Sequence, residues 1–303
     1  MEVIVLKKIL TIMMIALGIV VMTNGNTISA KTKASYKKGI VKITGKGKYS
    51  SKKFKNSKKV KKVIVGKNVT KIGNNAFIGC KNLKKISFNK KLKTIGEFAF
   101  KGTALNHVDI PTSVKKIGDG AFLIESLKEV KMPGNMHWSY SEIENELYFY
   151  TVDKVVFKTA ANYKTMLGVP ARKYVVSSKD KKYTSIDGAI YRNSDYKLML
   201  IPRVKEFTVS DKCQILDLYY INHFRYLSDD DYFETNSELE KITIPASVKK
   251  IVYTNTDKFE QYKKQVGNYP YKANFQFEVL NKNLDEASTK CLEKWNADFI
   301  NIK

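Results

Sequence analysis

One short phrase recurs at a fixed interval in this chain and limits its fold more than any other feature. The phrase is a leucine, two variable residues, an isoleucine or valine, one more variable residue and an apolar residue. Its copies at Leu83–Phe88, Leu105–Ile110 and Leu127–Met132 begin 22 residues apart. A valine-led copy, Val60–Val65, precedes them by 23 residues. A period of roughly 20 to 29 residues predicts a solenoid of stacked coils.

Two more phrases repeat in phase with the first. One ends in isoleucine and glycine (Val69–Gly73, Leu92–Gly96 and Val114–Gly118), and the other pairs an alanine with a phenylalanine (Ala76–Phe77, Ala99–Phe100 and Ala121–Phe122). A coil of this length cannot enclose its own apolar side chains, so stacking must cover them. We expect the alanines where neighbouring coils approach closely and the phenylalanines in the interior. We expect Gly73, Gly96 and Gly118 to adopt a positive φ, which costs glycine little.

These phrases resemble the BspA-type family of bacterial leucine-rich repeats, whose repeat runs L-x-x-I-x-I-P-x-x-V-x-x-I-G-x-x-A-F-x-x-C. The best match is Leu105–Phe122, Leu239–Ile251 returns to the same pattern, and Cys80 fits the cysteine position. The resemblance extends from about Gly39 to Leu280, is strong in 60–132 and 239–251, and is weak between them. It implies secreted or surface-exposed proteins that bind other molecules through the solenoid face and have no chemistry of their own.

The predicted fold is a leucine-rich-repeat solenoid, α/β and horseshoe-like, dominated by strands with short helical turns and capped at both ends. The strand Gly39–Gly45 is the expected amino-terminal cap, and Lys46–Lys59 is expected to be a basic loop. The expected divisions are a signal peptide (1–30), a basic segment with the cap strand (31–59), regular repeats (60–132), degenerate repeats with an insertion (133–238), and the last repeat with the carboxyl cap (239–303).

The degenerate part contains further expected elements. Gly134–Tyr150 is either an irregular coil or a protruding insertion. Asp187 and Gly188 indicate a hairpin, or a bend within a longer coil. Met199 is an extra residue relative to the resembled pattern. Strands are also expected at 154–157, 174–176, 197–202, 207–209, 213–216 and 274–280, and helices at 257–266 and 284–295, the second starting at Asp285.

The first thirty residues have the organisation of a secretory signal. Lys7 and Lys8 precede an apolar run, Ile9–Met22, and Ile28–Ala30 offers small residues for cleavage. The alternative is an uncleaved anchor, although the run is shorter than the roughly 20 residues that span a bilayer. Because no cysteine follows the run and no hydrophobic tail ends the chain, we expect a secreted or loosely surface-associated protein with no stable membrane anchor.

Charge is the strongest fact of composition, because the formal net charge is +25. It is also uneven: between Lys31 and Gly96 there are 22 lysines and no acid or arginine. This segment therefore carries a strong positive field that its own residues cannot neutralise. One explanation is an anionic partner, and the other is that lysine only keeps the protein soluble.

Alternation along a strand phrase predicts which side chains reach solvent. Ile86 and Phe88 should face the core and Ser87 the solvent. Stacking then aligns the variable positions in columns, Lys61 with Lys84, Asn106 and Lys128, and Lys62 with Lys85, His107 and Glu129. The second strand of the coil adds Lys71 to the outer surface. The candidate ligand-binding residues are Lys61, Lys62, Lys84, Lys85, His107, Lys128 and Lys131 on the first strand and Lys93, Lys115 and Lys116 on the second.

A rigid lysine ladder suits a linear polyanion, to which lysine offers point charge instead of bidentate geometry. The expected partners are a protein or an anionic glycan or cell-wall polymer, including host glycosaminoglycans and acidic glycoproteins. Specific nucleic-acid binding is disfavoured by the export signal and by the presence of only four arginines, none before Arg172.

Catalytic patterns are missing from the sequence. The three histidines lack the zinc-binding H-E-x-x-H spacing, and there is neither a nucleophile elbow nor a phosphate loop. We therefore expect no enzyme activity, cofactor or metal, and interpret the acidic Asp229–Asp231 with Glu234 as a solvated loop. Three widely spaced cysteines predict no disulfide framework, and Cys80 should be buried. The alternative is a carbohydrate-active enzyme or accessory domain that uses acids of the 137–149 segment, namely Glu142, Glu144 and Glu146, beside His137 and Trp138.

Overall fold

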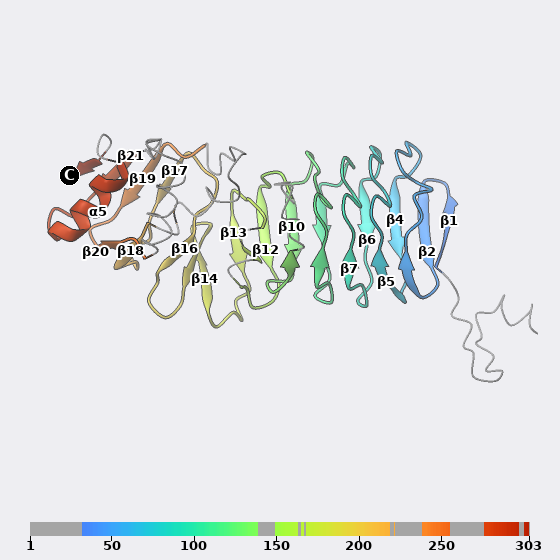
Figure 1. The fold of residues 1–303 in the computed structure, drawn as a ribbon, viewed down its shortest axis with the longest axis horizontal. Coiled ribbons are helices and arrows are strands. Elements are labelled where there is room, and N and C mark those ends of the chain that lie inside the picture. The colour runs from blue at the N-terminus through green and yellow to red at the C-terminus, as the bar shows by residue number, and fades with distance from the viewer. Residues whose placement is uncertain are drawn as a thin grey trace, which may run out of the picture.

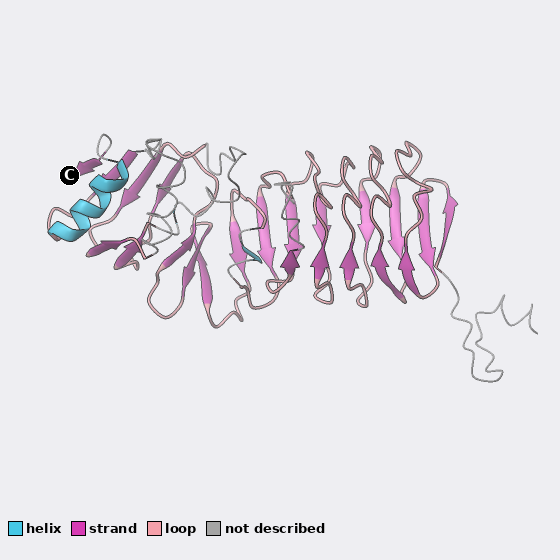
Figure 2. Ribbon diagram, viewed as in Figure 1, coloured by secondary structure: helices cyan, strands magenta, loops and turns pink. Residues whose placement is uncertain are grey.

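A computed structural model of the chain describes residues 32–138, 149–162, 165–166, 168–218, 221, 238–254, 276–296 and 300–302. Within these residues, short strands stack side by side along one axis, from the amino-terminal coils to a helix near the carboxyl end (Figure 1). Residues in strands far outnumber residues in helices (Figure 2). The predicted strand-dominated leucine-rich-repeat solenoid is therefore confirmed.

The recurring strand phrase forms the first side of each coil. Its strands pair in parallel and in register, so that Val63 lies opposite Ile86 and Val108 opposite Val130. One sheet, named here the β4 sheet, contains β1 (Lys33–Lys37), β2 (Ile40–Thr44), β4 (Lys62–Val65) and β6 (Lys85–Ser87). The next sheet along the axis contains β8 (His107–Asp109), β10 (Glu129–Met132), β12 (Lys154–Phe157) and β13 (Tyr174–Val176).

The isoleucine–glycine phrase forms the second side of each coil. In the second full coil, a corner of three residues, 66–68, separates the two strands. Val63 and Val65 on the first side and Ile72 on the second are all buried in one core. The second sheet, named here the β5 sheet, contains β3 (Gly47–Tyr49), β5 (Val69–Ile72), β7 (Thr94–Ile95), β9 (Lys116–Ile117) and β11 (His137–Trp138).

The third side of the coil differs from the expected short helical turns. Its backbone N–H groups donate to the next coil, from Phe77 to the carbonyl of Ala99 at 2.9 Å and from Phe100 to that of Ala121 at 2.9 Å. In a helix these N–H groups would donate to carbonyls of the same helix. Positive φ at Asn75, and at the equivalent positions 98 and 120, also interrupts any helical run. Coils are thus hydrogen-bonded to each other on all three sides.

A column of phenylalanine rings runs through the core along the axis. The rings of Phe54, Phe77, Phe100, Phe122 and Phe149 are stacked, with successive centroids 6.1, 5.6, 5.5 and 5.5 Å apart. All five side chains are buried. The predicted interior position of the three central rings is confirmed, and the column continues one coil beyond them in each direction.

The two outer rings correct the expected limits of the repeats. Lys46–Lys59 is not only a loop, because it contains strand β3 and the core residue Phe54. Coil stacking therefore starts before Val60. At the other end, β11 extends the β5 sheet and Phe149 extends the ring column, so coil stacking continues beyond Met132. Residues 139–148 of the expected irregular coil or insertion lie outside the described residues.

The positive φ expected of the glycines that end the second strand is wrong. Gly73, Gly96 and Gly118 do not have positive φ. A Cβ at Gly96 would lie 2.6 Å from the backbone nitrogen of Asn74 in the previous coil, and one at Gly118 would lie 2.5 Å from that of Glu97. Glycine is required here because two backbones approach too closely for any side chain.

The predicted alternation in β6 is only partly realised. Ser87 is exposed, whereas Ile86 and Phe88 are half-buried and pack against the core. Because β6 is the last strand of its sheet, the next coil covers these two side chains less completely. Phe88 still contacts Phe100 edge-on, with the ring centroids 6.0 Å apart.

The degenerate part of the chain continues with a hairpin. Asp187 and Gly188, with φ of 49° and 86°, form its turn, so the hairpin interpretation is confirmed. Met199 is the extra residue of a β-bulge, since Ile190 pairs with Leu200 and Tyr191 with Leu198. The three strands are β14 (Tyr183–Ile186), β15 (Ala189–Arg192) and β16 (Leu198–Leu200).

Beyond the hairpin the coils bury a second core, which includes Phe207, Ile242 and Phe277. The expected strand at 274–280 and helix at 284–295 are present, and Asp285 accepts the Ser288 N–H at the helix start, at 2.7 Å. The elements are β17 (Glu206–Thr208), β19 (Lys241–Ile244), β21 (Gln276–Val279) and β22 (Ile300–Ile302) in one sheet, β18 (Ile215–Asp217) with β20 (Lys250–Val252), and helix α5 (Glu286–Asn296).

The ends of the solenoid differ from its middle. At the amino end, β1 pairs antiparallel with β2 and lies at the edge of the β4 sheet. At the other end, α5 contacts β20 and β22. Capping by these segments stays a prediction. The expected signal, 1–30, and the expected helix at 257–266 lie outside the described residues.

Truncation of a central ring tests the ring column. We expect Phe100→Ala to lower the free energy of unfolding by about 3–5 kcal/mol, because it removes a buried aromatic stacked on both sides. Urea unfolding followed by circular dichroism measures the change. Tyr150→Ala, at a side chain that is 43% exposed, is the control and should change stability little. Equal losses in the two variants would contradict a continuous aromatic core.

Asparagine substitutions distinguish close approach from positive φ as the reason for glycine. Gly102 has a φ of 67°, and the nearest atom to its added Cβ is 3.8 Å away. Asn56 already occupies the equivalent position two coils earlier, with a φ of 56°. Because asparagine tolerates this conformation, we expect Gly102→Asn to change stability by less than about 1 kcal/mol. Gly96→Asn should cost about 1–3 kcal/mol or more through overpacking. If thermal unfolding showed a larger loss of stability for Gly102→Asn than for Gly96→Asn, positive φ would be the better explanation for glycine at position 96.

Candidate binding surface

The stacked coils bring four of the candidate lysines together at the β4 sheet: Lys62 and Lys85 are the first residues of β4 and β6, and Lys61 and Lys84 come immediately before them. Lys62 lies directly opposite Lys85, and the Lys84 N–H donates to the Lys61 carbonyl at 3.1 Å. Their neighbours Val63 and Val65 are buried, so alternation turns Lys62 outward. Lys61, Lys84 and Lys85 are exposed. Neighbouring strands in a sheet are about 4.8 Å apart, which is closer than the screening length of about 8 Å at physiological salt.

Three further lysines on this sheet are absent from the sequence-based set. In β1 and β2, Lys33, Lys37 and Lys42 are exposed, and Lys42 lies opposite Ile64 of β4. Lys33 lies opposite Thr44, which is exposed next to the buried Ile43. The alternation in Gly39–Gly45 carried this signal, but the strand was interpreted only as a cap.

No acid faces these lysines from their own part of the chain, since none occurs between Lys31 and Gly96. Among the described residues, no ion pair involves Lys61, Lys62, Lys84 or Lys85. Their positive charges therefore add to one another across β1 to β6. The β4 sheet is the acid-free part of this side of the solenoid.

The same side changes character at β8, where three other candidates lie. His107 Nε2 is 3.2 Å from Glu129 Oε2, and the Lys131 and Lys154 ammonium groups are 3.9 and 3.8 Å from Glu129 Oε1. Asp109 on β8 pairs with Lys158. The predicted alignment of His107 with Glu129 is thus present, but it places the imidazole beside a carboxylate. His107 and Lys131 both lie close to an acid and do not extend the acid-free set of lysines.

Lys128 stands at the border of that cluster. Its N–H donates to the Asn106 carbonyl at 2.9 Å, as the predicted column requires. Its side chain is exposed. The structure therefore separates it from Lys61 and Lys84 by the uncharged Asn106.

The remaining candidates lie on a different face. Lys93, Lys115 and Lys116 are exposed on or beside strands of the β5 sheet, and the Lys115 N–H donates to the Lys93 carbonyl at 2.8 Å. Lys71 and Lys116 align with the intervening Thr94. Because both sheets turn their buried side chains toward one core, the ten candidates do not form one patch.

Several described charges on the first side of the carboxyl half form ion pairs. On the first side, the Lys241 ammonium is 3.1 Å from Glu206 and 3.9 Å from Glu278, and Lys205 is 2.7 Å from Glu240. These pairs connect neighbouring strands β17, β19 and β21, so opposite charges alternate from coil to coil.

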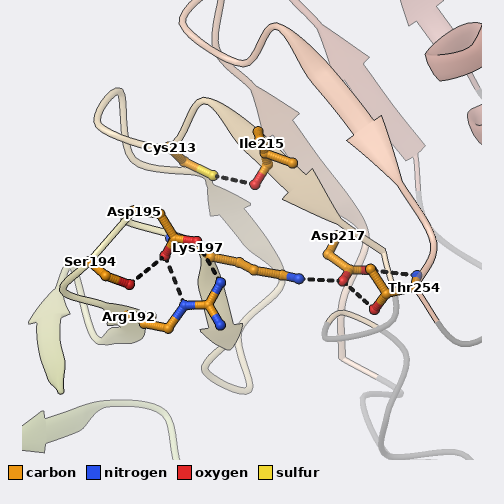
Figure 3. A network of polar contacts seen from close by, with 8 residues as sticks. All are labelled: Arg192, Ser194, Asp195, Lys197, Cys213, Ile215, Asp217 and Thr254. Carbon is orange, nitrogen blue, oxygen red and sulfur yellow. Dashed lines mark hydrogen bonds and ion pairs between the residues drawn. The ribbon is translucent and has the colours of Figure 1, made fainter.

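A polar network, buried at its Asp217 end, lies between the hairpin and the second core (Figure 3). The Lys197 ammonium is 2.6 Å from Asp217, which is 0% exposed and also accepts the Thr254 hydroxyl at 2.6 Å. Arg192 binds Asp195 and holds the pKa of that carboxyl below its usual range. Breaking a buried pair of this kind costs about 3–5 kcal/mol. The network joins the hairpin to β18 and the chain after β20, which is a structural role.

Side chains that could act as nucleophiles or bind a metal are few among the described residues. Burial raises the pKa of the Cys80 thiol, which is 0% exposed, as expected for a core cysteine. No group of three or more metal-binding side chains occurs in this part of the chain. The acids at 142, 144 and 146, the acidic run at 229–231 with Glu234, and the His137 and Trp138 side chains lie outside what the structure describes. No described helix has the length and hydrophobicity needed to span a bilayer.

Known proteins resemble this chain in structure and in the sequence of its repeats. Solved structures similar to this chain are bacterial leucine-rich repeat proteins. One from Eubacterium ventriosum has 18% identity and a TM-score of 0.41, covering 91% of this chain and 85% of its own. The pneumococcal vaccine antigen PcpA has 15% identity and a TM-score of 0.42, covering 88% and 77%. A T. pallidum leucine-rich repeat protein has 14% identity and a TM-score of 0.35, covering 91% and 96%. No curated protein matches the chain.

The repeats also match a known family over part of the chain. Residues 48–163 match the BspA type leucine rich repeat region in six copies. These residues are therefore of the BspA type, as the resemblance predicted. The match begins within β3, in agreement with coil stacking that starts before Val60.

Proposed function

We propose that this protein is a non-catalytic binding protein of the bacterial surface or its surroundings that holds a linear polyanion on the β4 sheet. One observation carries the proposal: lysines that lie in register on stacked strands, with no acid in the same stretch of sequence. The BspA-type repeats support a binding role. A secreted or surface-associated location rests on the sequence of residues 1–30.

A polymer of regularly spaced negative charges suits this arrangement better than a folded protein with a few acids. Lysines held on neighbouring strands of a rigid sheet require little reorganisation, and a polymer can follow them along the stack. Sulfated or phosphorylated polysaccharides have this chemistry. Lys61, Lys84 and Lys85 are exposed, so contact with such a polymer needs no unfolding. His107 and Lys131 are left out of the site because the Glu129 carboxylate lies beside both of them and would repel a polyanion.

Charge reversal on the β4 sheet tests the proposal. We expect the triple variant Lys61→Glu, Lys84→Glu and Lys85→Glu to lose roughly a hundredfold or more in affinity for heparin, at about 1 kcal/mol for each lysine at an anionic surface. Binding is measured by surface plasmon resonance on immobilised heparin. A circular dichroism spectrum equal to that of the wild type shows that the variant folds.

The matched control changes the net charge by the same amount elsewhere. Lys179, Lys181 and Lys249 are exposed and lie outside both lysine-bearing sheets. Their triple change to Glu should weaken binding far less. If both triple variants lose the same affinity, net charge alone governs binding and the β4 sheet is not the site. If neither loses affinity, the polyanion proposal itself is contradicted, and a protein partner becomes the better hypothesis.

A further inference from the structure

We propose that the β5 sheet is a second polyanion-binding surface, so that one molecule joins two polyanionic chains. This inference rests on the proposed function of the β4 sheet. It adds a bridging activity: the protein would cross-link anionic polymers as well as bind them.

The β5 sheet carries its own aligned lysines. Lys48 lies opposite Lys71 on the next coil, and Lys93 is hydrogen-bonded through its backbone to Lys115. Lys48, Lys93 and Lys115 are exposed, and so is Lys116. Among the described residues, no ion pair involves these lysines. The strands of this sheet contain no acid from β3 to β9.

Acids on the third side of the coil leave these lysines unneutralised. Glu97 follows the end of β7, and its carboxylate accepts a hydrogen bond from the Asn74 side chain at 2.9 Å. Asp119 follows β9 at the equivalent place and is half-buried. Both acids therefore lie past the glycine that ends the second strand.

The geometry gives two tracks instead of one. On each sheet the lysine columns run across the strands, along the axis of the stack. The buried sides of the two sheets, which include Val63 and Ile72, face the same core. Their exposed sides therefore point in different directions, and a ligand on one sheet does not cover the other. A polymer that follows one column continues along the axis and leaves the other face open.

The corner between the two faces allows an alternative to bridging, in which a single polymer binds both faces. Lys67, Lys90 and Lys91 are found there, between the first and second strands of their coils, and Lys67 and Lys91 are exposed. A long polymer could pass around this corner and occupy both faces at once. A short oligosaccharide cannot, so the length of the probe separates bridging from wrapping.

A capture experiment with the full chain tests bridging. The protein is bound to heparin-coated beads, the beads are washed, and a short fluorescent heparin oligosaccharide is added. We expect wild-type protein to capture the fluorescent probe in proportion to the protein bound. The β5-sheet variant, Lys93→Glu with Lys115→Glu and Lys116→Glu, should stay on the beads and capture at least about tenfold less probe for each bound molecule. The control variant at Lys179, Lys181 and Lys249 should capture as the wild type does.

The outcomes separate the inference from the proposed function. Equal capture by the β5-sheet variant and the wild type would overturn bridging through this sheet, including the case in which self-association joins two β4 sheets. Absence of capture by the wild type, with firm binding to the beads, would also overturn it. Failure of the proposed function has a different readout, which is undiminished heparin binding by the triple variant at Lys61, Lys84 and Lys85.

Discussion

Contact between successive coils is the interaction on which the whole structure depends. A coil of 22 or 23 residues has three sides and no interior of its own until the next coil covers it. Backbone hydrogen bonds join the coils on every side, and the ring column from Phe54 to Phe149 fills the space between them. The glycine that ends each second strand lets the backbones come this close. Removal of any one of these elements affects two coils at once.

The same contact explains how a charged surface forms. Parallel pairing in register places equivalent residues of successive coils side by side, so a variable position repeated as lysine becomes a column. Whether the lysines of a column repel one another or form ion pairs depends on whether an acid occurs at single positions of the repeat. Where Glu129 and Asp109 enter the pattern, the column becomes a set of ion pairs. Where they are missing, on the β4 sheet, the repulsion between lysines remains and an anionic ligand would relieve it. Such a surface costs stability, which is one reason to expect that it is used.

The sequence predicted the repeats well because their signal is local. Each phrase combines alternation, a fixed glycine and an alanine–phenylalanine pair, and the alanines and phenylalanines are buried as expected. The errors came from properties that depend on a neighbouring coil. The close approach at Gly96 is set by Asn74 of the previous coil, and no pattern within one repeat reveals it. Phe54 and Phe149 belong to the ring column although the phrases around them have decayed.

The residues of the predicted site lie on more than one surface, and the sequence did not reveal this division. Alignment of Lys62 with Lys85 followed from the period alone. The division into two faces did not, because the direction of the corner at 66–68 is a property of three-dimensional structure. The proximity of His107 and Lys131 to the Glu129 carboxylate could be recognised only from distances, because Glu129 lies on the next coil from His107. Lys42 was missed because its strand was interpreted only as a cap, and Lys33 and Lys37 were missed because no strand was expected at 33–37.

The salt dependence of heparin affinity tests most directly whether the stacked lysines act as one polyelectrolyte site. The logarithm of the association constant should fall linearly with the logarithm of the salt concentration, since the polymer releases condensed counterions when it binds. Neutralisation of Lys61, Lys84 and Lys85 to Gln should make the slope shallower by about 2, because each lysine that neutralises one charge of a single-stranded polymer adds roughly 0.7 to it. An affinity that does not depend on salt, or a slope that is the same in the neutralised variant, would contradict the account.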